Sequence, residues 1–184
     1  MNAFLPVDPA AATGKAAQLL TAVKAKLGIV PNMTRHMARS PAVLEAYLAM
    51  NGALAAGALD AKLREQIALA TAQANACDYC LSAHSMIGKG AGLDAADIAR
   101  AREGDAADGR AGAVLAFVKA LLAARGQVTE ADVAAVRAAG LGDGAIGEIV
   151  ANVALNVFTN YFNNVTHPVI DFPVVRARAV AKAA

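Results

Sequence analysis

Apolar residues recur along this chain at the three- and four-residue intervals of amphipathic helices, and no segment shows the strict alternation of a strand. Capping residues, prolines and glycines separate the apolar rows. The pattern predicts an all-α helical bundle. Its helices are expected at about residues 9–26, 33–38, 41–55, 61–75, 77–87, 95–102, 111–124, 130–139 and 144–164.

Two of these helices have start signals that matter below. Asp8-Pro9 places a capping carboxylate before a proline, so we expect the first helix to begin there and to stop at Gly28. Asp60 is expected to cap the helix that contains Glu65.

A weak local repeat links residues 94–102 (DAADIARAR) with residues 129–137 (TEADVAAVR). Each segment is followed by a turn with glycine and then by a longer apolar helix. The repeat indicates either an internally duplicated helical hairpin or two independent ways of capping a short helix.

Composition narrows the class of protein. A chain of 184 residues is expected to form a single domain, residues 1–184. The formal net charge is +2 and the basic residues are scattered, so we expect no nucleic-acid partner. No apolar run of about 18 residues predicts a membrane span, and the first residues do not resemble a signal peptide. The two cysteines suit a catalytic dithiol in a reducing, cytoplasmic compartment.

The most informative stretch is residues 65–84, which contains both cysteines and one of the three histidines. On a helix, Cys77, Cys80 and His84 would share one face. Cys80 and His84 are i, i+4 neighbours, close enough for the imidazole to take a thiol proton directly or through one water. This pattern suits thiol–disulfide redox chemistry, in which one sulfur attacks and the other resolves.

Glu65 can reach this site only if the helix breaks. On one unbroken helix it would lie about 18 Å from Cys77 and be turned roughly 120° from the shared face. Residues 74–76 offer the break, since Asn75 is a good capping residue. We therefore expect one helix to end near Asn75 and the next to start near Cys77, where the helix dipole favours a thiolate. Glu65 would then orient His84.

The spacing E-x11-C-x2-C-x3-H in an alanine- and leucine-rich helical chain resembles the AhpD-like alkylhydroperoxidase group of the carboxymuconolactone decarboxylase superfamily. Three other segments are similar to its peroxidase-related branch: residues 30–32 (VPN), 40–41 (SP) and 156–173 (NVFTNYFNNVTHPVIDFP). The resemblance covers about residues 28–173, which we expect to form the core of an AhpD-like helical bundle.

The resemblance implies a thiol-dependent peroxidase that reduces organic hydroperoxides or hydrogen peroxide. It implies that Cys80 is attacked by the peroxide, that Cys77 resolves the product, and that Glu65 and His84 form a proton relay. A dithiol or thioredoxin-like reductant would close the cycle, without a cofactor or a metal. Trimers or hexamers are also implied, and a chain that is 57% hydrophobic suits subunit contacts.

One position departs from the family pattern. The best-known members have a histidine just before the second cysteine, where this chain has Tyr79. A neutral phenol cannot supply imidazole acid–base chemistry at pH 7. Tyr79 would instead either line the substrate pocket or cap the start of the helix.

Other functions stay open for the same residues. The two cysteines, His84 and Glu65 could bind zinc, but structural zinc usually draws on a second pair of ligands elsewhere. The cysteines could be inert and buried, since cysteine packs as a small hydrophobe. A lyase or isomerase could use His84 and Glu65 as acid and base, although proton transfer needs no dithiol. A non-enzymatic redox sensor is the remaining alternative.

Five asparagines lie close together in the last long helix: Asn152, Asn156, Asn160, Asn163 and Asn164. They form either a solvated polar edge or a row of amides that bonds to neighbouring groups or faces the dithiol pocket. Asn156 is the expected pocket residue. His36, on a short helix between two arginines, is expected at the surface.

Overall fold

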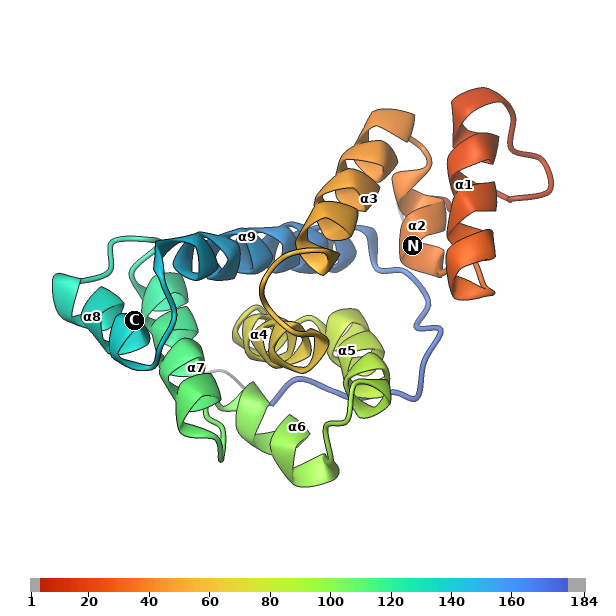
Figure 1. Ribbon diagram of the computed structural model, residues 1–184. Coiled ribbons are helices and arrows are strands. Elements are labelled where there is room, and N and C mark those ends of the chain that lie inside the picture. The colour runs from red at the N-terminus through yellow and green to blue at the C-terminus, as the bar shows by residue number, and fades with distance from the viewer. Residues whose placement is uncertain (1–3, 179–184) are drawn as a thin grey trace.

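The computed structural model describes residues 4–178. These residues form helices and no strands, which confirms the all-α prediction (Figure 1). The helices are α1 (Gly14–Leu27), α2 (Asn32–Met37), α3 (Pro41–Ala55), α4 (Ala61–Ala74), α5 (Asp78–Gly90), α6 (Ala95–Arg102), α7 (Gly109–Ala123), α8 (Glu130–Ala138) and α9 (Asp143–Thr166).

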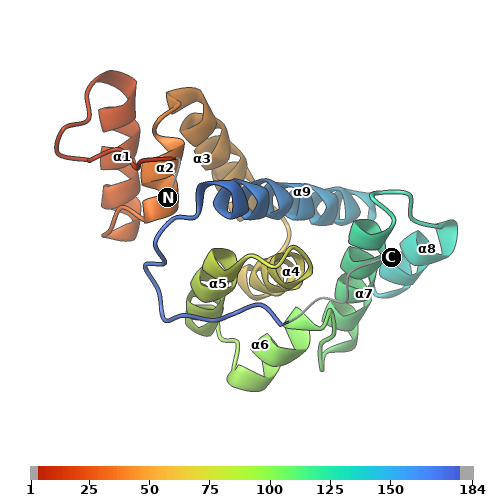
Figure 2. The ribbon, with the colours of Figure 1, turned by 180° about the vertical axis from the view of Figure 1, so that it is seen from behind.

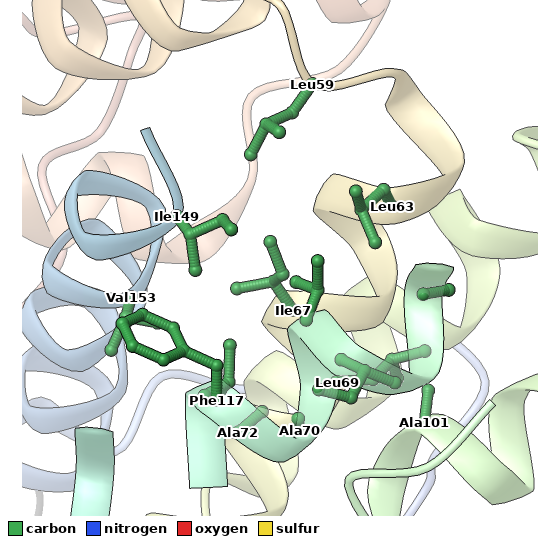
Figure 3. Packing of buried hydrophobic residues seen from close by; sticks show 14 of the residues in the cluster. Leu59, Leu63, Ile67, Leu69, Ala70, Ala72, Ala101, Phe117, Ile149 and Val153 are labelled. Atoms are coloured by element: carbon green, nitrogen blue, oxygen red, sulfur yellow. The ribbon is translucent and has the colours of Figure 1, made fainter. Parts of the chain in front are cut away.

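Helix α4 is the centre of the bundle and contacts α5, α6, α7 and α9. Its side chains are apolar or small on most faces, so neighbouring helices can cover it on nearly all sides. Ile67 of α4 is fully buried and points toward Ile149 of α9 and the side chains of α7 (Figure 3). Burying one such side chain contributes about 1.5–3 kcal/mol.

A second, smaller layer forms at one end of α9. Helices α1, α2 and α3 pack there around Leu20, Met37 and Leu44, apart from the main core (Figure 1). We call these three helices the N-terminal layer. It contacts the main bundle mainly where α3 meets α9.

The first helix begins later than the sequence predicts. Asp8 does cap a backbone N–H, but that N–H belongs to Ala10 in a short turn. The chain then reaches Thr13 in an extended conformation and Gly14 at φ 57°, and only there does α1 start. The start at residue 9 was therefore wrong, because an Asp-Pro pair also favours a turn. The predicted end at Gly28 is confirmed.

Both segments of the local repeat form short helices with the same start. In α6 and in α8 the capping side chain and the aspartate three residues later bond each other's backbone N–H groups. The shared cap accounts for the sequence similarity, and a duplicated hairpin stays a prediction.

After α9 the chain returns across the bundle as an extended C-terminal strap, residues 168–178. The strap runs along α5 and on toward α6 (Figure 2). It is held by Ser82, whose hydroxyl accepts the Val175 N–H at 2.9 Å, and by Asp78, whose carboxylate accepts the Ala177 N–H at 2.8 Å. Both anchors belong to α5, the helix that contains Cys80 and is capped by Cys77.

No single described helix is long and apolar enough to cross a membrane, although α8 and α9, bent by 114° at their junction, pass together by length and composition.

His36 is buried in the N-terminal layer, so the expectation of a surface position was wrong. Its neighbours in sequence are arginines, but α2 is covered by α1 and α3. The Nδ1 atom has no hydrogen-bond partner among the described residues. Burial lowers the pKa of His36 below its ordinary value of 6.5, and the charge of Arg35 lowers it further.

We expect this histidine to make the fold less stable in acid. Below pH 6.5 the unfolded chain takes up a proton at His36 that the folded chain resists, so the free energy of unfolding falls as the pH falls. Urea unfolding midpoints at pH 7.5 and pH 5.0 would measure this. The midpoint of His36→Gln should fall less than that of the wild type, and an equal fall would contradict the prediction.

Candidate active site

The site is built at the junction of α4 and α5. Helix α4 ends with Asn75 as its C-cap, Ala76 takes a left-handed conformation at φ 49°, and Cys77 is the N-cap of α5. This reversal confirms the predicted break near Asn75 and the predicted start near Cys77. It turns α5 back along α4, so side chains from both helices meet.

Cys77 and Cys80 form a disulfide across the first turn of α5. The Cys77 sulfur also accepts the Cys80 backbone N–H at 3.2 Å, which caps the helix. Both residues are buried, but only Cys80 borders the large cavity described below. The two sulfurs are therefore not equivalent toward a molecule in that cavity.

Glu65 and His84 form an ion pair or hydrogen bond beside the dithiol. Glu65 Oε2 lies 2.7 Å from His84 Nδ1, and both side chains border the cavity. When the carboxylate accepts a proton held on Nδ1, the other ring nitrogen is left free to act as a base. The structure thus brings together the four residues expected from the sequence.

A cavity of about 390 Å³ lies between the N-terminal layer and helices α4, α5 and α9. Its apolar walls come from each of these parts. Examples are Leu27, Leu48, Leu54, Ile87, Leu155 and Phe172. Polar residues border the cavity together with Cys80, among them Glu65, His84, Asn156 and Asn163. The cavity thus combines room for an apolar molecule with acid–base and thiol groups.

Four of the five asparagines on α9 are buried, so a solvated polar edge describes only Asn164. Asn156 borders the cavity as expected, and its Nδ2 donates to the Asn152 carbonyl at 2.8 Å. The asparagine that touches the dithiol is Asn163, whose Nδ2 lies 3.2 Å from Cys80 Sγ. Sequence reasoning missed it, although it lies seven residues after Asn156 and so on the same helix face.

Tyr79 borders the cavity and lies in the first turn of α5. Its hydroxyl donates to Asp171 Oδ2 at 2.6 Å and accepts the Met33 N–H at 3.2 Å. Asp171 also accepts two hydrogen bonds from Asn32. Burial, and then the carboxylate of Asp171, raise the pKa of Tyr79 far above its ordinary value. The phenol is therefore neutral at pH 7 and joins α2, α5 and the strap.

Asn32 and Asp171 were not singled out from the sequence as site residues. Each lies inside a segment that supports the family resemblance, VPN at residues 30–32 and IDFP at residues 170–173. Their position in these two segments was the sequence signal that could have identified them as site residues.

Tyr47 of α3 is a further cavity residue that the sequence did not indicate. Burial raises its pKa to about 12, and the nearby charge of Glu65 adds to the effect. Among residues 4–178, no three histidine, cysteine, aspartate or glutamate side chains are arranged to hold a metal ion.

Comparisons with known proteins match the segment in which this site lies. The carboxymuconolactone decarboxylase family profile matches residues 41–124, a segment that contains Glu65, both cysteines and His84. A protein of Haemophilus influenzae is 52% identical over 46 residues, which are 24% of this chain and 41% of that protein. The chain thus spans less than half of that curated relative.

Solved structures extend the likeness over most of the chain. The alkylhydroperoxidase AhpD core of a peroxidase-related protein from Ralstonia eutropha JMP134 is 29% identical, with a TM-score of 0.82 over 93% of both chains. A peroxidase-related protein from Silicibacter sp. TM1040 is 25% identical, with a TM-score of 0.80 over 91% of both chains. A debrominase is 21% identical, with a TM-score of 0.78 over 93% of both chains, and shares the fold.

The family match contains the dithiol and its acid–base pair, and the helices outside it follow the same fold as the peroxidase-related structures. Residues 41–124 therefore form a carboxymuconolactone decarboxylase family domain, and the chain as a whole has an AhpD-like fold.

Proposed function

We propose that this protein is a thiol-dependent peroxidase that reduces organic hydroperoxides or hydrogen peroxide. The observation that carries the proposal is the position of Cys80, which borders the cavity while its disulfide partner Cys77 is fully buried behind it. A peroxide in the cavity would meet Cys80 first. The peroxidase-related structures of the same fold support the same class of activity.

The reaction has two steps on the protein. The Cys80 thiolate attacks one peroxide oxygen, so that an S–O bond forms, the O–O bond breaks, and the leaving alkoxide takes up a proton to become the alcohol. Cys77 then attacks the sulfenic acid sulfur, the disulfide forms, and the hydroxyl group leaves as water. An external dithiol or thioredoxin-like reductant returns both cysteines to thiols and is itself oxidised.

Glu65 and His84 serve this reaction as a proton relay in the proposal. His84 removes the Cys80 proton before attack and can return one to the leaving alkoxide. The Glu65 carboxylate, 2.7 Å from Nδ1, keeps the imidazole oriented. Tyr79 has no part in proton transfer, because its hydroxyl already donates to Asp171.

Mass spectrometry tests the proposal directly. The reduced protein is treated with one equivalent of cumene hydroperoxide, and the free thiols are then alkylated. We expect conversion to the Cys77–Cys80 disulfide, and in Cys77→Ser we expect a sulfenic acid trapped at Cys80. Thiols that stay reduced would overturn the peroxidase proposal.

Failure of that test would favour the other reactions open to this site. A lyase or isomerase that uses His84 and Glu65 would keep its activity when both cysteines are replaced by alanine. A zinc-stabilised module would contain stoichiometric metal and unfold when the metal is chelated.

We also propose that the protein acts as a homo-oligomer, a trimer or a hexamer. Helix α9 supplies a surface for such contacts, because one side of it exposes a row of large apolar residues: Val150, Phe158, Tyr161 and Val165.

A further inference from the structure

Asn163 is the one polar side chain of α9 with a hydrogen bond to the dithiol among the described residues. Its Nδ2 lies 3.2 Å from Cys80 Sγ and 3.3 Å from the sulfur of Met33. The side chain is buried and borders the cavity. It therefore contacts the Cys80 sulfur from α9, a different helix from those that supply Glu65 and His84.

The contacts determine which end of the amide faces the sulfurs. Neither the methionine sulfur nor a disulfide sulfur has a hydrogen to donate. If the amide were turned around, its oxygen would face two acceptors, whereas the NH₂ group can give one hydrogen to each sulfur. The donors of Asn163 are thus both used on sulfur atoms.

This arrangement leaves the amide oxygen of Asn163 unpaired within residues 4–178. Asn163 Oδ1 is buried and has no hydrogen-bond partner among the described residues. Buried polar atoms are normally paired, so an unpaired acceptor beside a reactive group needs an explanation. A functional requirement for the N–H donors supplies one.

The hydrogen bond to Cys80 gains strength when the disulfide is reduced. A disulfide sulfur is a weak acceptor, whereas a thiolate carries a full charge, and hydrogen bonds to charged groups are about twice as strong. Because α9 already holds the amide in place, the donor does not need to reorganise when the charge appears.

We propose that Asn163 stabilises the Cys80 thiolate through its Nδ2 hydrogens, and thereby sets both the nucleophilicity of Cys80 and the reduction potential of the Cys77–Cys80 pair. Only the consequence for peroxide attack rests on the proposed peroxidase function. The thiolate and the redox equilibrium belong to the dithiol itself, whatever it reacts with.

The first test is a thiolate titration of Cys80 in the Cys77→Ser background, followed by absorbance at 240 nm. Asn163→Leu should raise the pKa of Cys80, so that about tenfold less thiolate is present at a given pH below it. Asn163→Asp keeps the shape and places a carboxylate beside the sulfur, so it should raise the pKa further. Equal titration curves for all three proteins would overturn the proposal.

The second test uses the protein with both cysteines, equilibrated with reduced and oxidised glutathione and then alkylated. Loss of the N–H donors destabilises the reduced form, so the disulfide of Asn163→Leu should be about tenfold harder to reduce. For a two-electron couple this corresponds to a potential about 30 mV more negative. An unchanged or more positive potential would overturn the proposal.

Asn160→Leu is the matched control. Asn160 is also buried on α9, but its oxygen accepts from Asn75 Nδ2 and it has no hydrogen bond to either cysteine. In this variant the pKa of Cys80 and the reduction potential of the cysteine pair should stay at wild-type values. Shifts equal to those of Asn163→Leu would overturn the proposal, because the loss of any buried amide on α9 would then have the same effect. Neither test requires peroxide, so a failed peroxidase proposal and a failed role for Asn163 give different results.

Discussion

Cys80→Ser is expected to reduce the consumption of cumene hydroperoxide to the rate measured without protein. A serine hydroxyl is not ionised near pH 7 and cannot replace a thiolate as the nucleophile. Cys80 is the cysteine that borders the cavity, so Cys77 has no comparable access to a bound peroxide. Loss of peroxide, followed in a single turnover with pre-reduced protein, measures the effect.

Cys77→Ser is the control for that experiment. It removes the other half of the same disulfide but leaves Cys80 at the cavity. We expect it to consume about one equivalent of peroxide and then stop at the sulfenic acid, because no thiol of the same chain can resolve it. If Cys80→Ser consumed one equivalent and Cys77→Ser consumed none, the assignment of the two roles would be reversed.

His84→Gln is expected to slow disulfide formation by about 10²–10⁴-fold at pH 7, the usual range for loss of a general base. The amide cannot take the Cys80 proton. Glu65→Gln should have a smaller effect in the same direction, because it removes the charge from the contact with Nδ1 and leaves the imidazole in place. Stopped-flow measurement across pH 6 to 9 would follow both variants.

The pH profile separates a catalytic role from a structural one. Loss of a general base should make the rate of disulfide formation depend less on pH. At high pH, hydroxide should restore part of the rate of His84→Gln. Tyr47→Phe is the control, since Tyr47 borders the same cavity and its pKa of about 12 keeps it neutral. If His84→Gln formed the disulfide at the wild-type rate, the proton relay would have no part in the mechanism.

The parts of the structure that depend on local signals follow directly from the sequence. Asp60 caps the helix expected of it, because the capping side chain and the N–H group it bonds lie three residues apart, and Asp94 and Thr129 cap α6 and α8 in the same way. The predicted start of α1 was wrong because the local signal at this point fits two structures. Asp8 and Pro9 also form a local turn, and propensity alone does not separate the two outcomes.

The candidate site also combines residues that are close in sequence with contacts between residues that are far apart in sequence. Glu65, the two cysteines and His84 lie within one stretch of two helices, so their spacing and one correctly placed break brought them together. Asn163 and Cys80 are 83 positions apart, and Tyr79 and Asp171 are 92 apart. Such contacts depend on how α9 and the C-terminal strap cross the bundle. The local signals of a single sequence do not determine how these segments cross. The same holds for His36, which became buried because α1 and α3 cover it.

The reacting groups and the walls around them come from different parts of the chain. Residues 41–124 supply the dithiol, Glu65 and His84. The rest of the cavity lining comes from α3, which lies in the same segment, and from α1, the turn before α2, α2 itself, and α9 with the strap that follows it. The flanking segments can therefore change in evolution, or be exchanged in chimeras between relatives, while the cysteines, Glu65 and His84 stay in place, provided that Asn163 is kept. The selectivity of this protein would then be redesigned in these flanking segments rather than at its cysteines.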